Sequence, residues 1–387
     1  MSSMHEVSGH QLTLLRSGEE YFPSLLAAIH SARHSIYLEA YIFAADTVGR
    51  LFKEALESAA VREVAVHVLL DGFGSEDLPV AWLDEMRAFG VQVLKFRPQV
   101  ARLTFRRQRL RRLHRKLVLI DERIAFVGGI NIIVDMPDET QATRLDYAVE
   151  VRGPVVAQIT HSMRKLWQLV SWTNLRSSGT RVRRLQRQKS AQQEVLFLIR
   201  DNFRYRQNIE QAYLHAIWHA QHEIIIANAY FLPGHRFRNA LQDAVKRGVR
   251  VVLLLQGKVD HYLMHFATLA LYDELLQAGM EIHECTQNLL HAKVAVVDGK
   301  WATVGSSNID PFSLWLAREA NLVVQDSGFA GALRESLLHE MQHGAHLVAH
   351  TDWRGQSVRV RLLARASYAL VKFLAGTTGY ARKNDNF

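Results

Sequence analysis

The segment His114-Arg-Lys-Leu-Val-Leu-Ile-Asp121, followed by Gly128-Gly129-Ile-Asn131, occurs twice in this chain. The second copy is His291-Ala-Lys-Val-Ala-Val-Val-Asp298, followed by Gly305-Ser306-Ser307-Asn308. In both copies the lysine comes 2 residues after the histidine, the aspartate 7 and the asparagine 17. Five fixed positions recurring at one spacing have chance odds on the order of 10⁻⁴. The repeat therefore indicates an internal duplication.

The predicted elements around the two copies also follow one order. Apolar spacing predicts helices over residues 21–33, 47–60 and 80–89, with strands over 35–43, 64–70 and 91–96. The second half predicts helices over 213–222, 237–247 and 262–278, with strands over 223–231, 249–255 and 280–284. Helices that alternate with apolar strands are typical of a sheet covered on both faces. We expect an α/β protein with a mixed sheet flanked by helices in each half.

Length and duplication together predict two domains. The 387 residues exceed the ceiling of about 250–300 residues for a single hydrophobic core. We place the first domain at residues 10–175 and the second at 194–355. Residues 176–193 are polar and basic and form the predicted linker, and 356–387 form a basic amphipathic C-terminal segment.

Composition limits the class of protein and its partners. With 48% hydrophobic and 22% charged residues the chain is typical of a globular protein. A net charge of +9 favours anionic partners, either nucleic acid or the phosphate surface of a membrane. No apolar run reaches the roughly 18 residues of a membrane span, and the first 20 residues do not resemble a signal peptide. A single cysteine, Cys285, excludes an internal disulfide.

Each motif copy continues as a predicted β-hairpin that turns at its aspartate. Residues two apart on a strand share a face, so histidine and lysine point the same way, whereas Asp121 and Asp298 lie at the turns. The turn position favours a structural role for both aspartates over a catalytic one. Four residues allow the backbone to approach a bound anion, namely Gly128, Gly129, Gly305 and Ser306.

Two such copies supply the groups that a phosphodiester displacement needs. One neutral imidazole can attack phosphorus while the other, protonated, delivers a proton to the leaving group. Lys116, Lys293, Asn131 and Asn308 are predicted to hold the non-bridging oxygens. We expect no metal or other cofactor, because two lysines supply the positive charge that Mg²⁺ supplies elsewhere.

A nucleophilic histidine also needs an acceptor for its second ring nitrogen. We expect each copy to have its own carboxylate on a downstream strand, with Asp146 serving His114 and Glu319 serving His291. The alternative is that both carboxylates are solvated charges on edge strands.

The pattern His-x-Lys-x4-Asp-x6-Gly-[Gly/Ser]-x-Asn, present twice, resembles the phospholipase D superfamily. Chain order, including Glu39-Ala-Tyr-Ile-Phe and Leu70-Asp-Gly-Phe-Gly, is similar over roughly residues 10–355 to the bacterial cardiolipin synthases of that superfamily, especially the shorter type B without transmembrane helices. The resemblance implies two α/β/α sandwich domains related by a pseudo-twofold axis, with the active site at their interface. It also implies that a phosphatidyl group from phosphatidylglycerol passes through a phosphohistidine to a second phospholipid, with His114 as nucleophile and His291 as general acid and then base.

A basic run precedes the first motif. Residues 102–116 carry Arg or Lys at 8 of 15 positions, with Leu103, Phe105, Leu110 and Leu113 between them. We expect this run to bind an anionic membrane surface through Arg106, Arg107, Arg109, Arg111 and Arg112. This would place the protein peripherally at the cytoplasmic face of the bacterial inner membrane. The alternatives are a solvated loop or a grip on a nucleic acid backbone, but base-stacking aromatics are sparse, so no nucleic acid partner is expected.

Residues 358–374 are predicted to form a helix with an apolar and a basic side. This helix could lie in the membrane interface or simply pack on the second domain. His339-Glu-Met-Gln-His343 matches the zinc-protease pattern, with His346 and His350 beyond it. A helical wheel puts these histidines on the solvent face, opposite Leu333 and Leu337, so we expect no metal site there.

Three interpretations of function remain open at this point. They are a phosphatidyltransferase, a phospholipase D-like hydrolase or nuclease, and a non-catalytic module that binds anionic membranes. Binding alone does not need two matched histidines, so the intact double set of His, Lys and Asn disfavours the module. The sequence leaves the oligomeric state open.

Overall fold

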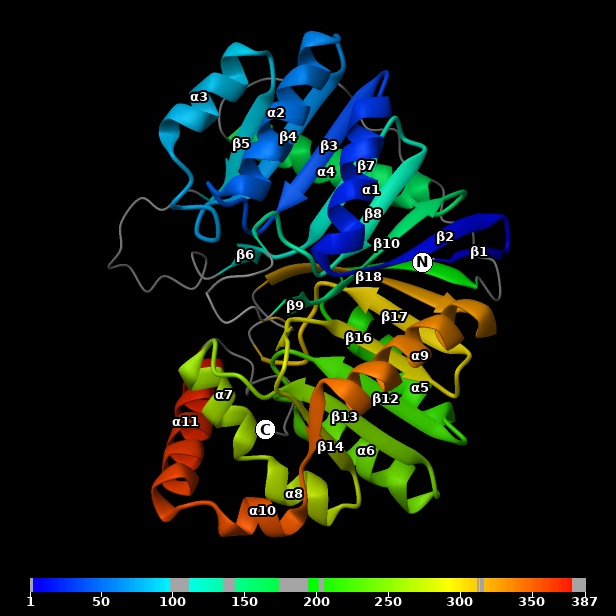
Figure 1. The fold of residues 1–387 in the computed structure, drawn as a ribbon, viewed down its shortest axis with the longest axis vertical. Helices are drawn as coiled ribbons and strands as arrows, with labels where there is room; N and C mark the ends of the chain where they lie inside the picture. The colour runs from blue at the N-terminus through cyan, green and yellow to red at the C-terminus, as the bar shows by residue number, and fades with distance from the viewer. Residues whose placement is uncertain are drawn as a thin grey trace.

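The computed structural model describes residues 3–97, 111–134, 143–173, 194–201, 205–311, 313 and 317–377, which form two stacked α/β halves (Figure 1). The first sheet has the strand order β1-β2-β10-β8-β7-β3-β4-β5. Its strands are β1 (Met4–Val7), β2 (His10–Arg16), β10 (Tyr147–Arg152), β8 (Ile124–Gly128), β7 (Lys116–Ile120), β3 (Ser35–Ala40), β4 (Ala65–Asp71) and β5 (Gln92–Phe96). β3, β4 and β5 are parallel, whereas the remaining neighbours are antiparallel.

The second sheet repeats this plan in the order β11-β18-β17-β16-β12-β13-β14-β19. Its strands are β11 (Val195–Arg200), β18 (Ala317–Gln325), β17 (Trp301–Gly305), β16 (Lys293–Val297), β12 (Glu223–Asn228), β13 (Arg250–Gln256), β14 (Glu281–Cys285) and β19 (Ala345–Leu347). β12, β13 and β14 are again the parallel ones. The predicted mixed sheets and the duplication are therefore present in the fold.

Helices cover both faces of the sheets. The first half has α1 (Ser17–Ser31), α2 (Thr47–Val61), α3 (Val80–Ala88) and α4 (Val156–Thr173), and the second has α5 (Asn208–His219), α6 (His235–Lys246), α7 (Tyr262–Leu269), α8 (Tyr272–Gln277), α9 (Ser327–His343), α10 (His350–Gly355) and α11 (Val358–Thr377). Two of these helices begin at aspartate caps, where Asp46 accepts from Gly49 N and Asp326 from Phe329 N. None of the described helices is long and apolar enough to cross a membrane.

Strand alternation divides most of the apolar side chains of the two sheets between three of the four hydrophobic clusters of the described residues. Val118 and Ile120 of β7 pack under α1–α3, and Ala295 and Val297 of β16 pack in the corresponding core of the second half. The intervening residues of the same strands, including Leu117 and Val294, point the other way and meet in one cluster shared by both halves. Helices α4 and α9 also contribute to this shared cluster, which joins the two halves and fixes the two motif copies side by side.

Two short strands cross between the halves. β6 (Arg112–Leu113) pairs in parallel with the start of β18, and β9 (Arg144–Leu145) pairs in parallel with β15 (Leu289–Leu290). The segment that precedes each histidine is therefore hydrogen-bonded to the segment that precedes the carboxylate of the opposite half.

Several boundaries differ from the sequence prediction. The predicted helix over 262–278 is two helices, because the Leu271 N–H bonds to Thr268 O instead of continuing the α-helical pattern. β1 extends the first sheet ahead of residue 10, where we placed the start of the domain. The predicted linker, residues 176–193, lies outside the described residues. The predicted C-terminal helix is present as α11.

Candidate active site

The first half of the site joins His114 to Glu319. His114 Nδ1 lies 2.9 Å from Glu319 Oε1, and the His114 N–H donates to Arg318 O over 3.0 Å. Glu319 is fully buried on β18, next to the strand β6 that leads into the histidine. Backbone pairing and a side-chain hydrogen bond together fix the imidazole ring.

The second half joins His291 to Asp146 in the same way. His291 Nδ1 lies 2.7 Å from Asp146 Oδ2, and the His291 N–H donates to Leu145 O over 2.8 Å. Asp146 is also buried and accepts a hydrogen bond from Tyr147 N.

The expectation that each motif copy keeps its own carboxylate is wrong. Each histidine bonds to the carboxylate of the opposite half, because β6 and β9 pair with strands of that half. Burial of both carboxylates also rules out the alternative of solvated edge-strand charges. Neither copy contains a complete histidine–carboxylate pair, so the site exists only where the halves meet.

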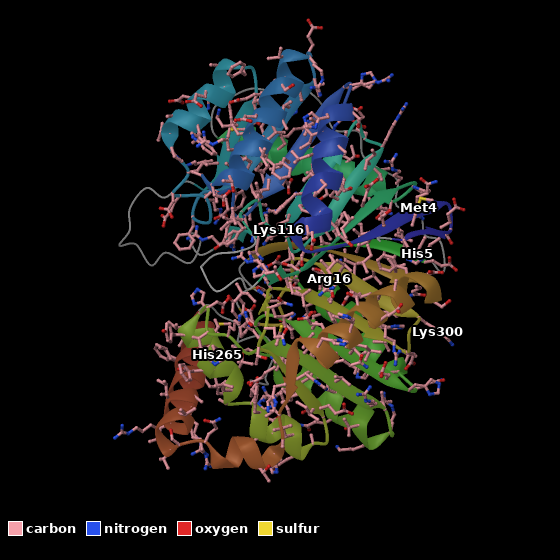
Figure 2. All side chains as sticks on the ribbon, viewed as in Figure 1. Met4, His5, Arg16, Lys116, His265 and Lys300 are labelled. Carbon is pink, nitrogen blue, oxygen red and sulfur yellow. The ribbon has the colours of Figure 1, made fainter. Side chains whose placement is uncertain are left out.

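Two buried lysines lie beside the histidines, and Figure 2 shows Lys116 at the boundary between the two sheets. Lys116 Nζ donates to His114 O over 2.8 Å, and Lys293 Nζ donates to His291 O and lies 3.4 Å from Asp146 Oδ2. Burial and the charge of Lys293 lower the pKa of Lys116 to about 7. Burial also lowers the pKa of Lys293. An anionic substrate would relieve this concentration of positive charge.

His291 is in an electrostatic environment that disfavours its protonation. Burial and the nearby Lys293 lower its pKa to about 3, although the hydrogen bond to Asp146 acts in the opposite direction. Burial raises the pKa of Asp146, but Lys293 and the His291 contact lower it further, so the net shift is downward. In the absence of substrate, His291 is therefore a neutral imidazole beside an ionised carboxylate at neutral pH.

The residues after each hairpin differ between the halves. A β-carbon at Gly129 would lie 2.3 Å from Asp146 Oδ1, so the glycine lets this short carboxylate approach closely. The equivalent Ser306 instead donates its hydroxyl to Glu319 Oε2 over 2.6 Å. Gly128 and Gly305 pack against Ala148 and Asn321 of the neighbouring strands. These packing contacts explain why both positions hold small residues. That the backbone at these positions approaches a bound phosphate stays a prediction.

The two asparagines are buried beside the hairpins. Asn131 Oδ1 accepts from Ile42 N over 3.3 Å. Within the described ranges, Asn308 Oδ1 is buried without a hydrogen-bond partner. An unpaired polar atom at a buried position is unfavourable unless a ligand or solvent satisfies it.

Asp121 and Asp298 hold the hairpins and lie at the strand ends remote from the histidines. Each accepts three backbone N–H groups at 2.7–2.9 Å: Asp121 from Arg33, His34 and Ser35, and Asp298 from Gln221, His222 and Glu223. Their backbones adopt positive φ values of 51° and 52°. These contacts are those of turn residues that hold the hairpins, which is the role that their positions predict.

Two positioning groups escaped the sequence reasoning. Asp71 Oδ2 accepts from Leu113 N over 2.7 Å, and Gln256 Oε1 accepts from Leu290 N over 3.3 Å. Leu113 and Leu290 immediately precede the two histidines, so each side chain fixes the entry to one half of the site. Asp71 belongs to the Leu70-Asp-Gly-Phe-Gly segment, which carried part of the family resemblance without an assigned role.

A buried ion pair supports the first half alone. Arg115, between the motif histidine and lysine, pairs with Glu39 and donates to Ser162 Oγ over 2.9 Å. The corresponding residues of the second half are Ala292 and Asn228, which cannot form such a pair. Tyr41 adds a ring that lies 4.7 Å from the His114 ring and 5.2 Å from Lys116 Nζ.

A different bridge supports the second half. Glu340 is buried and accepts from Arg16 of the first half over 2.9 Å and from Asn288 Nδ2 over 2.8 Å. Glu340 is the glutamate of the zinc-protease-like pattern, and its carboxylate points away from His339 and His343, which stack on each other at 4.3 Å. Among the described residues, no three His, Cys, Asp or Glu side chains gather as a metal site would require.

The basic run is partly described. Arg106, Arg107 and Arg109 lie outside the described residues, whereas Arg111 and Arg112 are half-buried, Arg112 as the first residue of β6 and Arg111 just before it. The Arg112 guanidinium lies 4.8 Å from the Phe73 ring centroid. These two arginines therefore lie close to the backbone that leads into His114.

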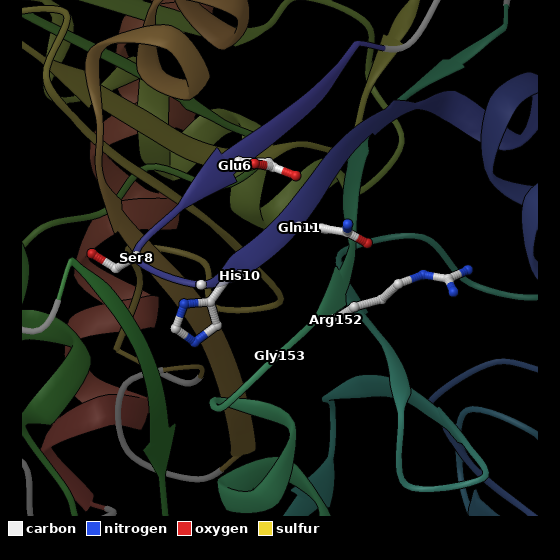
Figure 3. A pocket seen from close by; sticks show the side chains of 7 residues that line it. Glu6, Ser8, His10, Gln11, Arg152 and Gly153 are labelled. Atoms are coloured by element: carbon white, nitrogen blue, oxygen red, sulfur yellow. The ribbon is translucent and has the colours of Figure 1, made fainter.

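A separate cavity of about 530 Å³ lies at the N-terminal hairpin (Figure 3). Its lining includes Glu6, His10 and Arg152. The His10 ring bonds to Val7 O and Val155 N, which gives the ring a structural role. No motif residue lines this cavity, so it is distinct from the site at the two histidines.

Comparison with known proteins identifies the family. The family model described as "Cardiolipin synthase, PLD-like domain" matches residues 25–167 and 213–341. The chain belongs to this family of phospholipase D-like proteins. Cardiolipin synthase B of Salmonella typhi is 41% identical over 337 residues, covering 85% of this chain and 80% of the relative. Cardiolipin synthase B of Escherichia coli K12 is 40% identical over 331 residues, with the same coverage.

A solved structure extends the likeness to the whole fold. Phosphatidylserine synthase of Haemophilus influenzae superimposes with a TM-score of 0.68 over 94% of each chain, at 14% sequence identity. The family and the fold thus agree with the resemblance carried by the repeated motif.

Proposed function

We propose that this protein is a phosphatidyltransferase that makes cardiolipin from phosphatidylglycerol and a second phospholipid. The observation that carries the proposal is the pair of histidines, each with a buried carboxylate on Nδ1 and a buried lysine beside it. Because the carboxylates occupy Nδ1, Nε2 is left for the reaction in both rings. The type B relatives, which cover most of this chain, supply the lipid chemistry.

In the first step, Nε2 of His114 attacks phosphorus of phosphatidylglycerol. A P–N bond forms, the bond to the glycerol oxygen breaks, and His291 gives its proton to that oxygen, so glycerol leaves. In the second step, a headgroup hydroxyl of another phosphatidylglycerol attacks phosphorus, His291 takes its proton, and the P–N bond breaks. Two phosphatidylglycerol molecules thus become one cardiolipin and one glycerol.

The lysines and asparagines would bind the non-bridging oxygens in both steps. The bound phosphodiester also offsets the charge of Lys293, which raises the pKa of His291 from its low value in the free protein and allows it to act as an acid. The positive charges of Lys116 and Lys293 would stabilise the phosphate oxygens, as a metal ion does in other enzymes.

We further propose that the protein works peripherally on the cytoplasmic face of the bacterial inner membrane. The basic run over residues 102–116, which includes Arg111 and Arg112, would contact lipid phosphates next to the first histidine. Anionic phospholipids are accordingly the expected partners.

The test is to incubate wild type, His114→Ala and His291→Ala with phosphatidylglycerol vesicles, and to measure lipids by mass spectrometry and released glycerol by an enzymatic assay. Wild type should form cardiolipin and glycerol in equal amounts, and both variants should lose at least about 10⁴-fold in rate. A phosphatidyl adduct that accumulates in His291→Ala alone would support attack by His114.

Other products would favour the other functions. Phosphatidic acid without cardiolipin would indicate a hydrolase, and cleavage of DNA without lipid turnover would indicate a nuclease. Vesicle binding without any turnover would indicate a non-catalytic membrane module.

A further inference from the structure

Helix α11 is held on the second domain by one face. Ala364 and Val371 are buried in the core of that domain, and the helix lies along α7, as Figure 1 shows. Tyr368 packs beside them, and its hydroxyl lies 3.4 Å from Arg238 Nη1. Of the two alternatives for the C-terminal helix, packing on the second domain is therefore correct for this face.

The opposite face of α11 exposes large apolar side chains. At 3.6 residues per turn, Leu362 and Phe373 point almost directly away from Ala364 and Val371, with Leu370 beside them. Leu362 is 59% exposed, Leu370 47% and Phe373 67%. Isolated exposed apolar residues are ordinary, but a strip along one helix marks a binding surface.

The charges on α11 all have the same sign. The helix Val358–Thr377 contains Arg359, Arg361, Arg365 and Lys372 and no aspartate or glutamate. Arg365 and Lys372 lie one above the other between the packed face and the exposed strip. Near an anionic bilayer each basic residue is worth about 1 kcal/mol, and apolar side chains beside it enter the lipid interface.

We propose that α11 is a docking helix that lies flat on an anionic phospholipid surface. A bilayer satisfies both features, because lipid phosphates meet the basic row while acyl chains take up Leu362, Leu370 and Phe373. A second copy of this helix would bring two cationic rows together without a carboxylate between them. Charge complementarity therefore favours lipid over self-association.

The helix α11 is also linked, through α7, to a residue near the second motif copy, since Ala229 N donates to Ala292 O and Tyr230 follows Ala229. α7, on which α11 packs, begins at Tyr262, which is 73% exposed and directly follows Asp260 and His261. Asp260 accepts from the Tyr230 hydroxyl over 2.5 Å, and Tyr230 is the second-half counterpart of Tyr41, whose ring touches that of His114. Docking through α11 would hold this part of the second half, from Tyr230 to Tyr262, against the surface that contains the lipid. This consequence rests on the proposed function, whereas docking itself does not.

The experiment measures sedimentation of the full chain with two kinds of vesicle, one of phosphatidylglycerol mixed with phosphatidylcholine and one of phosphatidylcholine alone. Wild type should bind the anionic vesicles. Leu362→Ser/Phe373→Ser should lower the partition coefficient by about tenfold or more. Arg365→Gln/Lys372→Gln should lower it several-fold at low salt and less at high salt.

The matched control is Leu51→Ser/Val61→Ser, which removes two exposed apolar side chains from α2 and should bind like wild type. Thermal unfolding must show that every variant is folded. If the α11 variants bind as wild type does, the proposal fails. If wild type is a dimer by light scattering and Leu362→Ser/Phe373→Ser is a monomer, the strip joins two copies and the proposal also fails.

Activity assays separate this proposal from the proposed function. With phosphatidylglycerol as vesicles, Leu362→Ser/Phe373→Ser should turn over more slowly than wild type. With a short-chain phosphatidylglycerol below its critical micelle concentration, the two should be equal. If no protein makes cardiolipin but the vesicle binding differs as described, docking stands and the phosphatidyltransferase assignment fails.

Discussion

The two halves of the site share a backbone plan and differ in the side chains that complete it. In each half a histidine N–H bonds to the opposite half, Nδ1 meets a carboxylate from that half, and the preceding residue is anchored by Asp71 or Gln256. The first histidine has a glutamate held by a serine hydroxyl, and the second has an aspartate that fits only because Gly129 lacks a β-carbon. A duplicated scaffold has thus been completed in two chemically distinct ways.

This difference teaches that the supports of the two histidines are not interchangeable. Burial and Lys293 lower the pKa of His291, whereas the first half contains the buried ion pair of Arg115 and Glu39 between His114 and Lys116. The choice of nucleophile between the two histidines therefore has to come from substrate-bound experiments.

The largest expected effect comes from the crossed carboxylates. Glu319→Gln and Asp146→Asn should each lower kcat by about 10²–10⁴-fold, because an amide no longer holds the imidazole in the required tautomer. Histidine NMR should show that Glu319→Gln perturbs the ring nitrogens of His114, and Asp146→Asn those of His291.

Asp121→Asn is the control for these substitutions, since it lies at the hairpin turn, and it should leave kcat within a few-fold. Perturbation of the histidine in the same half, with the opposite one unchanged, would contradict the crossed arrangement.

The next effect concerns the ion pair that the second half lacks. Arg115→Ala leaves Glu39 buried without its partner and should lower the free energy of unfolding by about 3–5 kcal/mol, measured by urea denaturation. Glu39→Asn/Arg115→Ala, which reproduces the residues of the second half, should recover much of that loss. If the double variant is less stable than Arg115→Ala alone, the pair is not the reason for the loss.

Gly129 and Ser306 occupy equivalent positions in the two halves, and substitutions at both test how each carboxylate is held. Gly129→Ala should lower kcat by about 10²-fold, because the new β-carbon would displace Asp146 from His291. Ser306→Gly removes one hydrogen bond to Glu319 and should cost about tenfold. Gly331→Ala is the control, since a β-carbon there meets nothing within 4 Å. Full activity in Gly129→Ala would show that Asp146 has another way to reach its histidine.

The smallest effect is on stability and has a defined pH dependence. Lys116 has a pKa of about 7 in the folded protein, against about 10.4 in an unfolded chain. The unfolded state therefore binds more protons between these values, and this lysine makes wild type less stable as pH falls through that window. Lys116→Met removes the penalty and should raise the melting temperature at pH 7 by about 2 °C while abolishing activity.

The gain in melting temperature of Lys116→Met over wild type should shrink as pH rises toward 10. Lys300→Met, at an exposed lysine, should show no such gain and serves as the control. A Lys116→Met variant that melts below wild type at pH 7 would mean that the ammonium is well compensated in the folded protein.

Much of the fold followed from local patterns in the chain. Periodicity gave the order of helices and strands, and the hairpin turns put Asp121 and Asp298 in the structural positions where they lie. The single helix that apolar spacing predicts over 262–278 is wrong, because the break after Leu269 depends on a backbone bond from Leu271 to Thr268 that apolar spacing does not reveal. The role of Glu340 was also hidden, since its partner Arg16 comes from the other half.

The repeated motif specified the reacting groups, because a histidine and a lysine two residues apart on a strand must share a face wherever that strand lies. Sequence also named Asp146 and Glu319 as the carboxylates. It assigned them to the wrong histidines, since the bonds join residues 145 and 205 positions apart in the chain. Those partners were set by the packing of the two sheets and by β6 and β9, which cross between the halves, and no spacing along one chain encodes that choice.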